Sequence, residues 1–329
     1  MTMILAPDLD PLTVPAGSVV RGGIPYADLA DGQAATFPLI VVAGAKPGPT
    51  AALVAGIHGD EFEGPAALWQ LAQTIQPKAL AGRLLIVPVA NLSAFSAGTR
   101  TSPIDLQNLA RIFPGDAGGT VSFRLAHALL TRVVERADFL VDCHSGGVRL
   151  AFLDVAGFYG PDADIPVALS EQSLDLAKDM SLSQLWRLPA RHGVLSYEAM
   201  RRGIPATGGE IGGRGGCLAE DARSYHDGIL RILARRGMIE TANLGPAKAY
   251  STCLVGDWAL APAGGFLDTH VSIGQRVMKG ELLATLSTPL GETIAKMAAG
   301  NNGLIMGVRH LRSIQAGEWA TCVVEEHRL

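Results

Sequence analysis

The sequence predicts an α/β protein with a mostly parallel mixed sheet covered by helices on both faces, followed by a small β domain. Three observations lead to this fold class. Short apolar runs alternate with segments of helical spacing over most of the chain. Two of these runs stop at a histidine that small residues follow. Beyond about Leu244 the sequence changes to short apolar runs separated by glycine and proline, which is typical of a β domain.

We expect strands where small and β-branched apolar residues run together, and helices where apolar residues recur every three or four positions. Residues 1–35 mix proline and glycine with short apolar pieces and are expected to contain lead-in strands. Pro65 fits the first turn of a helix that begins at Glu63 and ends before Pro77. The other expected elements are strands 38–44, 51–57, 83–89 and 138–143 and helices 122–136, 168–180 and 225–236.

Residues 91–115 are expected to be a long polar connection without an element of its own. Loops of this length are uncommon inside compact domains, and they are usually functional. We therefore expect this segment to contribute residues to a binding site.

Composition excludes several classes of partner. The 329-residue chain has a formal net charge of −4 and no block of lysine and arginine, so neither nucleic acid nor an anionic membrane is an expected partner. The N-terminus lacks a basic flank, and no stretch approaches 18 uninterrupted apolar residues. We expect a soluble, cytoplasmic protein; whether it forms a homo-oligomer stays open.

Histidines at two strand ends indicate a metal site. His58 and Glu61 follow the run 51–57, and their spacing lets one turn of chain aim both at a single point. His144 ends the run 138–143. A single histidine at a strand end is more often a core or capping residue. Two imidazoles and one carboxylate, however, are the common ligands of a hydrolytic zinc ion with an open fourth position.

Glu210 is the candidate acid/base group. It is the one carboxylate in the glycine-dense run 208–213, where bulky neighbours cannot hide it, and we expect it at the end of a further strand. By itself it could equally be a turn carboxylate that binds backbone amides. Asp60, Glu63 and Asp142 lie close to the candidate ligands and are expected to orient or cap them.

Four motifs in this order resemble the succinylglutamate desuccinylase/aspartoacylase family, relatives of the zinc carboxypeptidases. They are Gly-Ile-His-Gly-Asp-Glu-Phe-Glu-Gly, Gly-Thr-Arg with Asn-Leu-Ala-Arg-Ile-Phe-Pro-Gly, Asp-Cys-His-Ser-Gly and the glycine-rich segment of Glu210. The resemblance runs from about Pro38 to Gly213 and is weak in the β domain. It implies a zinc carboxypeptidase-like fold, with residues 1–243 as the zinc-dependent catalytic domain and 244–329 as the C-terminal β domain.

The resemblance also assigns roles to residues. It implies that His58, Glu61 and His144 hold one Zn²⁺ per chain, and that Glu210 accepts a proton from a metal-activated water and passes it to the leaving amine. Zinc chemistry agrees, because the ion lowers the pKa of bound water toward about 7 and polarises a carbonyl. Cobalt, nickel or manganese would suit a similar ligand set.

Arg111 matches the arginine that clamps a substrate carboxylate in this family, a task that suits a planar guanidinium. The family's usual Asn-Arg pair is Ala110-Arg111 here, so one side-chain donor is missing. Asn108 and Arg100 are the further candidate substrate contacts. Losing one donor can cost about 1–3 kcal/mol of discrimination, so we do not transfer the family's substrates.

The segment 271–283 of the β domain is similar to the lipoyl/biotinyl barrel-sandwich pattern. In that family the modified lysine lies at the following hairpin tip, but the expected tip here, 288–292, has none. Lys296 comes later, where that family has its next strand. A swinging-arm role is therefore not expected.

These observations predict a zinc-dependent hydrolase that cleaves the amide bond of a small N-acylated amino acid or a related carboxylate-bearing amide. The β domain is expected to narrow the mouth of the site. Two alternatives stay open: a metallocarboxypeptidase acting on a peptide, and a non-catalytic metal-binding or partner-binding protein.

Overall fold

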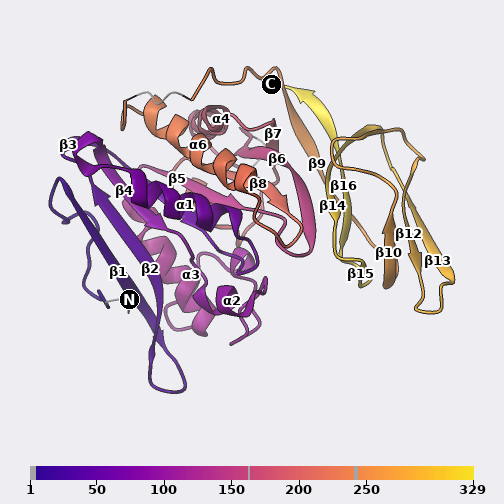
Figure 1. Cartoon of the computed structure of the whole chain (residues 1–329), viewed down its shortest axis with the longest axis horizontal. Coiled ribbons are helices and arrows are strands. Elements are labelled where there is room, and N and C mark those ends of the chain that lie inside the picture. The colour runs from indigo at the N-terminus through magenta and orange to yellow at the C-terminus, as the bar shows by residue number, and fades with distance from the viewer. Residues whose placement is uncertain (1–4, 162–163, 241–243) are drawn as a thin grey trace.

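A computed structural model describes residues 5–161, 164–240 and 244–329 of the chain. It consists of an α/β domain and a C-terminal β domain at its side (Figure 1). The predicted boundary between residues 243 and 244 falls at residues 241–243, which lie outside the described ranges. None of the helices within those ranges is long and apolar enough to cross a membrane.

The predicted helices and strands are present, with shifted ends. The helix expected from Tyr225, for example, begins at Ala219. The helices are α1 (Glu63–Thr74), α2 (Leu92–Ala97), α3 (Val121–Arg132), α4 (Val167–Met180), α5 (Leu195–Met200) and α6 (Ala219–Arg235). The strands are β1 (Ser18–Asp28), β2 (Ala34–Ala43), β3 (Lys46–Ala55), β4 (Ala81–Val87), β5 (Phe139–His144), β6 (Leu150–Tyr159), β7 (Gln184–Leu188), β8 (Ala206–Gly213), β9 (Thr252–Leu260), β10 (Gly265–Thr269), β11 (Arg276–Val277), β12 (Leu282–Ser287), β13 (Thr293–Ala298), β14 (Gly303–Arg309), β15 (Ser313–Ile314) and β16 (Trp319–Arg328).

The large sheet is mixed, with strand order β1-β2-β4-β3-β5-β8-β6-β7-β9-β16-β14-β11. Its central pairs β4–β3, β3–β5 and β5–β8 are parallel, whereas β1–β2, β2–β4 and β6–β8 are antiparallel. The prediction of a mostly parallel sheet therefore holds only in part. Residues 145–149 are too short a connection for a parallel crossover after β5, so the chain reverses and β6 runs antiparallel to β8.

Helices cover both faces of the sheet, as predicted. Along β2 the neighbours Val41 and Val42 point to opposite sides and belong to different core clusters. Val41 shares its cluster with Leu129 of α3, and Val42 shares the other with Leu68 of α1. Helices α1 and α6 lie side by side on one face of the sheet, and α3 lies on the other (Figure 1).

The connection 91–115 differs from the prediction, because it contains α2 and a 3₁₀ turn at Leu109–Arg111. The prediction missed these two elements because each is too short to show apolar spacing. Each begins after a capping asparagine. The Asn91 side chain accepts a hydrogen bond from Ala94 N, and the Asn108 side chain accepts one from Ala110 N. The segment is therefore ordered, and its 3₁₀ turn holds Arg111 beside the site.

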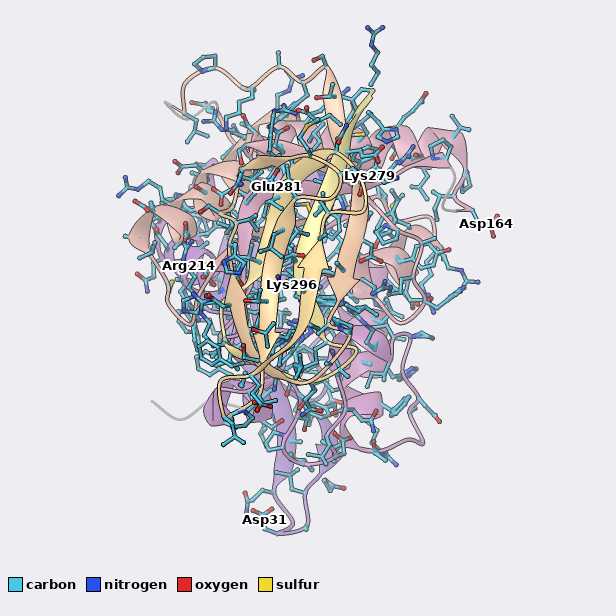
Figure 2. All side chains as sticks on the ribbon, turned by 90° about the vertical axis from the view of Figure 1, so that its right-hand side faces the viewer. Asp31, Asp164, Arg214, Lys279, Glu281 and Lys296 are labelled. Atoms are coloured by element: carbon cyan, nitrogen blue, oxygen red, sulfur yellow. The ribbon has the colours of Figure 1, made fainter. Side chains whose placement is uncertain are left out.

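The C-terminal β domain extends the large sheet and adds a small one. Strands β9, β16, β14 and β11 continue the large sheet, and β14 also pairs with β6. Strands β13, β12, β10 and β15 form a separate four-stranded sheet, which faces the viewer in Figure 2. The predicted tip at 288–292 joins β12 to β13, and Lys296 lies within β13 instead of at the tip.

Three neighbouring parallel strands position the candidate site. His58 follows β3, His144 is the last residue of β5, and Glu210 pairs with His144 in the register of β5 and β8. Gly56 allows the turn after β3, because its φ of +64° is a conformation that side chains disfavour. Gly64 lets α1 approach the sheet, since a Cβ there would lie 2.8 Å from the Cβ of Cys143.

Candidate metal centre and its pocket

The structure brings His58, Glu61 and His144 together. The Glu61 carboxylate lies between the two imidazoles, with Oε1 2.7 Å from His58 Nδ1 and Oε2 3.0 Å from His144 Nδ1. One ligand atom from each residue lies within 4.8 Å of the others. His58 and Glu61 are each only 2% exposed. Two nitrogens and a carboxylate oxygen therefore converge on a single buried point.

The outer ring nitrogens have their own partners. His58 Nε2 lies 3.1 Å from Asn108 Oδ1, and His144 Nε2 lies 3.3 Å from Asp142 Oδ1. Histidines that bind metals through one nitrogen usually engage the other in this way. The donor set and its support fit a divalent ion bound through both Nδ1 atoms and Glu61.

Tyr225 of α6 fixes the backbone of His144, a contact that the sequence did not predict. Its hydroxyl accepts a hydrogen bond from His144 N at 3.1 Å and donates one to His144 O. The spacing of α6 marked Tyr225 only as part of a helix. Its role becomes visible only because α6 crosses the end of β5.

The charges of His58, Glu61 and His144 shift one another's pKa values. Burial, followed by the charge of Arg100, lowers the pKa of His58 to about 4, so its imidazole is neutral near pH 7. Burial acts to lower the pKa of His144, but Asp142 and Glu61 outweigh it and raise that pKa well above its usual value. Because metal ligands must be deprotonated, an ion bound here would release the proton of His144.

Glu210 lies beside the three residues, inside β8 and not at a strand end as predicted. Its Oε2 is buried and has no hydrogen-bond partner among the described residues. Burial, followed by the negative charge of Glu61, raises the pKa of Glu210 to about 8. A buried carboxyl group that titrates near neutral pH has the property that acid/base chemistry requires.

The predicted substrate contacts occupy the rim of this centre. Arg100 Nη1 lies 3.0 Å from Glu61 Oε1, and Asn108 contacts His58, so both face the three residues directly. Arg111 donates through Nη1 to Ala110 O at 2.7 Å. Burial is the main cause that lowers the pKa of Arg111 to about 10, and the guanidinium therefore stays charged at neutral pH.

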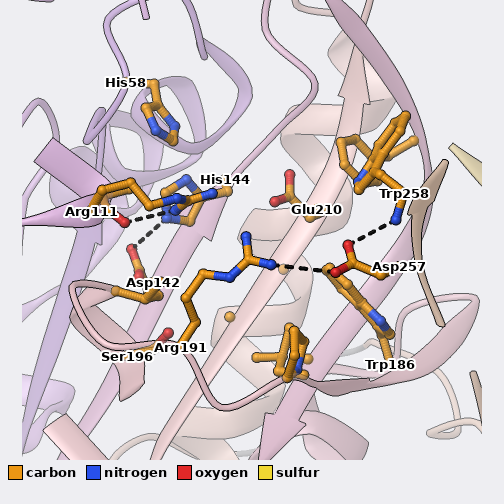
Figure 3. Close-up of a pocket in the computed structure, with 18 of the residues that line it drawn as sticks. His58, Arg111, Asp142, His144, Trp186, Arg191, Ser196, Glu210, Asp257 and Trp258 are labelled. Carbon is orange, nitrogen blue, oxygen red and sulfur yellow. Dashed lines mark hydrogen bonds and ion pairs between the residues drawn. The ribbon is translucent and has the colours of Figure 1, made fainter. Parts of the chain in front are cut away.

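The centre opens into a pocket of about 830 Å³, including open solvent at its mouth. The C-terminal β domain supplies part of its wall, including Asp257, Trp258 and Trp319. Arg191 reaches across the pocket toward Asp257 (Figure 3). Its Nη2 lies 3.3 Å from Asp257 Oδ2. Trp186 lies beside them. None of these residues was predicted, because none belongs to a motif and each meets the site only through tertiary packing.

Comparisons with known proteins found similar sequences and structures. The family model of the succinylglutamate desuccinylase/aspartoacylase catalytic domain matches residues 47–236. An N-alpha-acetyl-L-2,4-diaminobutyric acid deacetylase from Halomonas elongata is 29% identical over 300 residues, which are 89% of this chain and 86% of that protein.

Two solved structures are similar over nearly the whole chain. The product-bound ectoine utilization protein EutE (DoeB) from Ruegeria pomeroyi has a TM-score of 0.85 and 29% identity, covering 95% of this chain and 98% of that one. A succinylglutamatedesuccinylase/aspartoacylase from Rhodobacter sphaeroides has a TM-score of 0.86 and 26% identity, covering 98% of this chain and 99% of that one.

Proposed function

Because the chain belongs to the succinylglutamate desuccinylase/aspartoacylase family, we propose that it is a zinc-dependent deacylase of small N-acylated amino acids. The reaction hydrolyses an amide to a carboxylic acid and an amine. The observation that carries the proposal is the convergence of His58, Glu61 and His144 beside Glu210, whose buried Oε2 has no hydrogen-bond partner among the described residues.

We assign His58, Glu61 and His144 to hold one Zn²⁺, which is the ion that two imidazoles and one carboxylate most often bind in hydrolases. When bound, the ion supplies Lewis-acid polarisation of the acyl carbonyl and lowers the pKa of water. The neutral His58 imidazole and the flanking contacts from Asn108 and Asp142 support this assignment.

Glu210 is the proposed acid/base residue. Its carboxylate accepts a proton from water as the water oxygen attacks the acyl carbon. The same carboxyl group then gives a proton to the nitrogen of the departing amine as the amide C–N bond breaks. Its raised pKa keeps both protonation states accessible near neutral pH.

Arg111 is the proposed anchor for the substrate carboxylate, with Arg100 and Asn108 at the rim. Arg111 forms no ion pair with any carboxylate of the described residues, so its charge is available to a ligand. The pocket wall contributed by the β domain favours a small substrate over a folded peptide. The activity of the Halomonas elongata relative makes acetylated diamino acids the first compounds to test.

The assay that tests this function compares acylated amino acids with peptides. We expect the zinc-loaded protein to release acetate from N-acetylated amino acids, including Nα-acetyl-L-2,4-diaminobutyrate, or succinate from N-succinylated ones. Unblocked dipeptides should stay intact. Cleavage of dipeptides alone would identify a carboxypeptidase, and no turnover of any compound would indicate a non-catalytic metal-binding protein.

A further inference from the structure

Arg111 stands out because its guanidinium is held by few contacts. One Nη1 hydrogen bond to Ala110 O, at 2.7 Å, is its only hydrogen bond to a described residue. Burial and the charges of Arg100 and Arg191 disfavour its positive charge, whereas the carboxylates of Glu210 and Asp257 favour it. One hydrogen bond through a single Nη atom leaves the plane of the guanidinium free to turn, so a further contact is needed to fix its direction.

An aromatic ring from the β domain provides that contact. Arg111 Cζ lies over the ring of Trp319, 5.9 Å from its centroid. The negative face of an indole attracts a guanidinium, and the flat group also stacks on it. Trp319 is the first residue of β16, so the contact joins the two domains.

The Trp319 ring is itself held in place. Trp258 of β9 stacks on it with centroids 5.2 Å apart and planes 6° apart. Phe152 of β6 meets Trp258 edge-on, with centroids 5.4 Å apart. Trp258 is 8% exposed, so this aromatic column is anchored in the core where β6, β9 and β16 meet.

We propose that Trp319 is a positioning residue that holds the Arg111 guanidinium toward the substrate carboxylate. The inference rests on the proposed function. It also addresses Ala110, whose side chain offers no hydrogen-bond donor to that carboxylate beside Arg111. In this chain Arg111 binds the substrate carboxylate, and the Trp319 ring of the C-terminal β domain supports Arg111 from behind.

The test compares an acid with its carboxamide. KM and kcat are measured for the N-acetylated amino acid that the wild type hydrolyses fastest, and for its C-terminal amide, which lacks the negative charge. Met keeps a flexible apolar side chain at this position but has no aromatic ring. Trp319→Met should raise KM for the acid about 3- to 30-fold with kcat nearly unchanged. KM for the amide should change less than about 2-fold. Trp319→Phe keeps an aromatic ring, so its KM for the acid should stay close to the wild-type value.

A second measurement combines Trp319→Met with Arg111→Gln, and it separates a role through Arg111 from a purely structural role of Trp319. In that background, Trp319→Met should have almost no further effect on the acid, because the partner of the ring is gone. Trp69→Met is the matched control: Trp69 is 41% exposed on α1, packs edge-on to Phe95, and should leave both substrates unaffected.

The inference would be overturned if Trp319→Met raised KM equally for the acid and the amide. It would also be overturned if Trp319→Met raised KM for the acid as much in the Arg111→Gln background as in the wild type. If Trp319→Met does not fold, Trp319→Leu takes its place: a rise in KM confined to the acid supports the inference, and an equal rise, or none, on both substrates contradicts it. A wild type that hydrolyses no acylated amino acid would instead refute the proposed function, and the inference with it.

Discussion

Replacing Glu210 with glutamine is expected to lower kcat at least about 100-fold, because the amide cannot accept or donate the proton that the reaction moves. Glutamine keeps the shape of the side chain. Glu210 Oε2 has no hydrogen-bond partner among the described residues, so the substitution breaks no contact of that atom. The metal content of Glu210→Gln should match that of the wild type.

Acetate release and elemental analysis of the same preparation measure both quantities. Glu292→Gln, in the exposed tip between β12 and β13, is the control and should retain full activity. Unchanged hydrolysis by Glu210→Gln would remove Glu210 from the mechanism, whereas loss of metal from that variant would reassign it to the metal centre.

Removing the metal is expected to reduce hydrolysis at least as much as Glu210→Gln does. A chelator should abolish hydrolysis by the wild type, and one equivalent of Zn²⁺ should restore it, because the ion supplies several kcal/mol of transition-state stabilisation. His144→Ala should lose at least about 100-fold in kcat/KM and should not recover with one equivalent of Zn²⁺, since one of three ligands is gone.

His310→Ala is the matched histidine control, because His310 is exposed in the β domain and far along the chain from the three proposed ligands. It should respond to chelator and zinc as the wild type does. Wild-type hydrolysis that persists after the metal has been stripped to below one tenth of an equivalent would rule out zinc dependence.

The convergence of the three proposed ligands could be predicted from the sequence because its signals are local. His58 and Glu61 lie within one turn of chain, and His144 ends an apolar run that is easily identified as a strand. Parallel strands end at the same edge of a sheet, so two such ends can meet at one ion. The structure places these residues together as that reasoning expected.

The pocket wall could not be predicted in the same way. Trp258 and Trp319 read as ordinary strand residues, and Arg191 lies in an irregular segment before α5. They reach the site only because β9 pairs with β7 and β14 pairs with β6, which brings the β domain against the strands of the α/β domain. Pairings between segments so distant in sequence leave no periodic signal in either segment.

The mixed sheet has a different explanation. Alternation of strands and helices predicted parallel neighbours, but β5 and β6 are separated only by residues 145–149. That connection length, and not the apolar pattern, decides strand direction. Counting residues between His144 and Leu150 would have indicated the reversal.

The most direct test of the central claim is anomalous diffraction from crystals of the zinc-loaded protein. We expect one strong zinc peak per chain, about 2.0–2.2 Å from His58 Nδ1, His144 Nδ1 and a Glu61 oxygen. The Glu210 carboxylate should lie beside the open coordination position. A zinc ion bound elsewhere, or crystals in which these three side chains hold no ion at saturating zinc, would contradict the account.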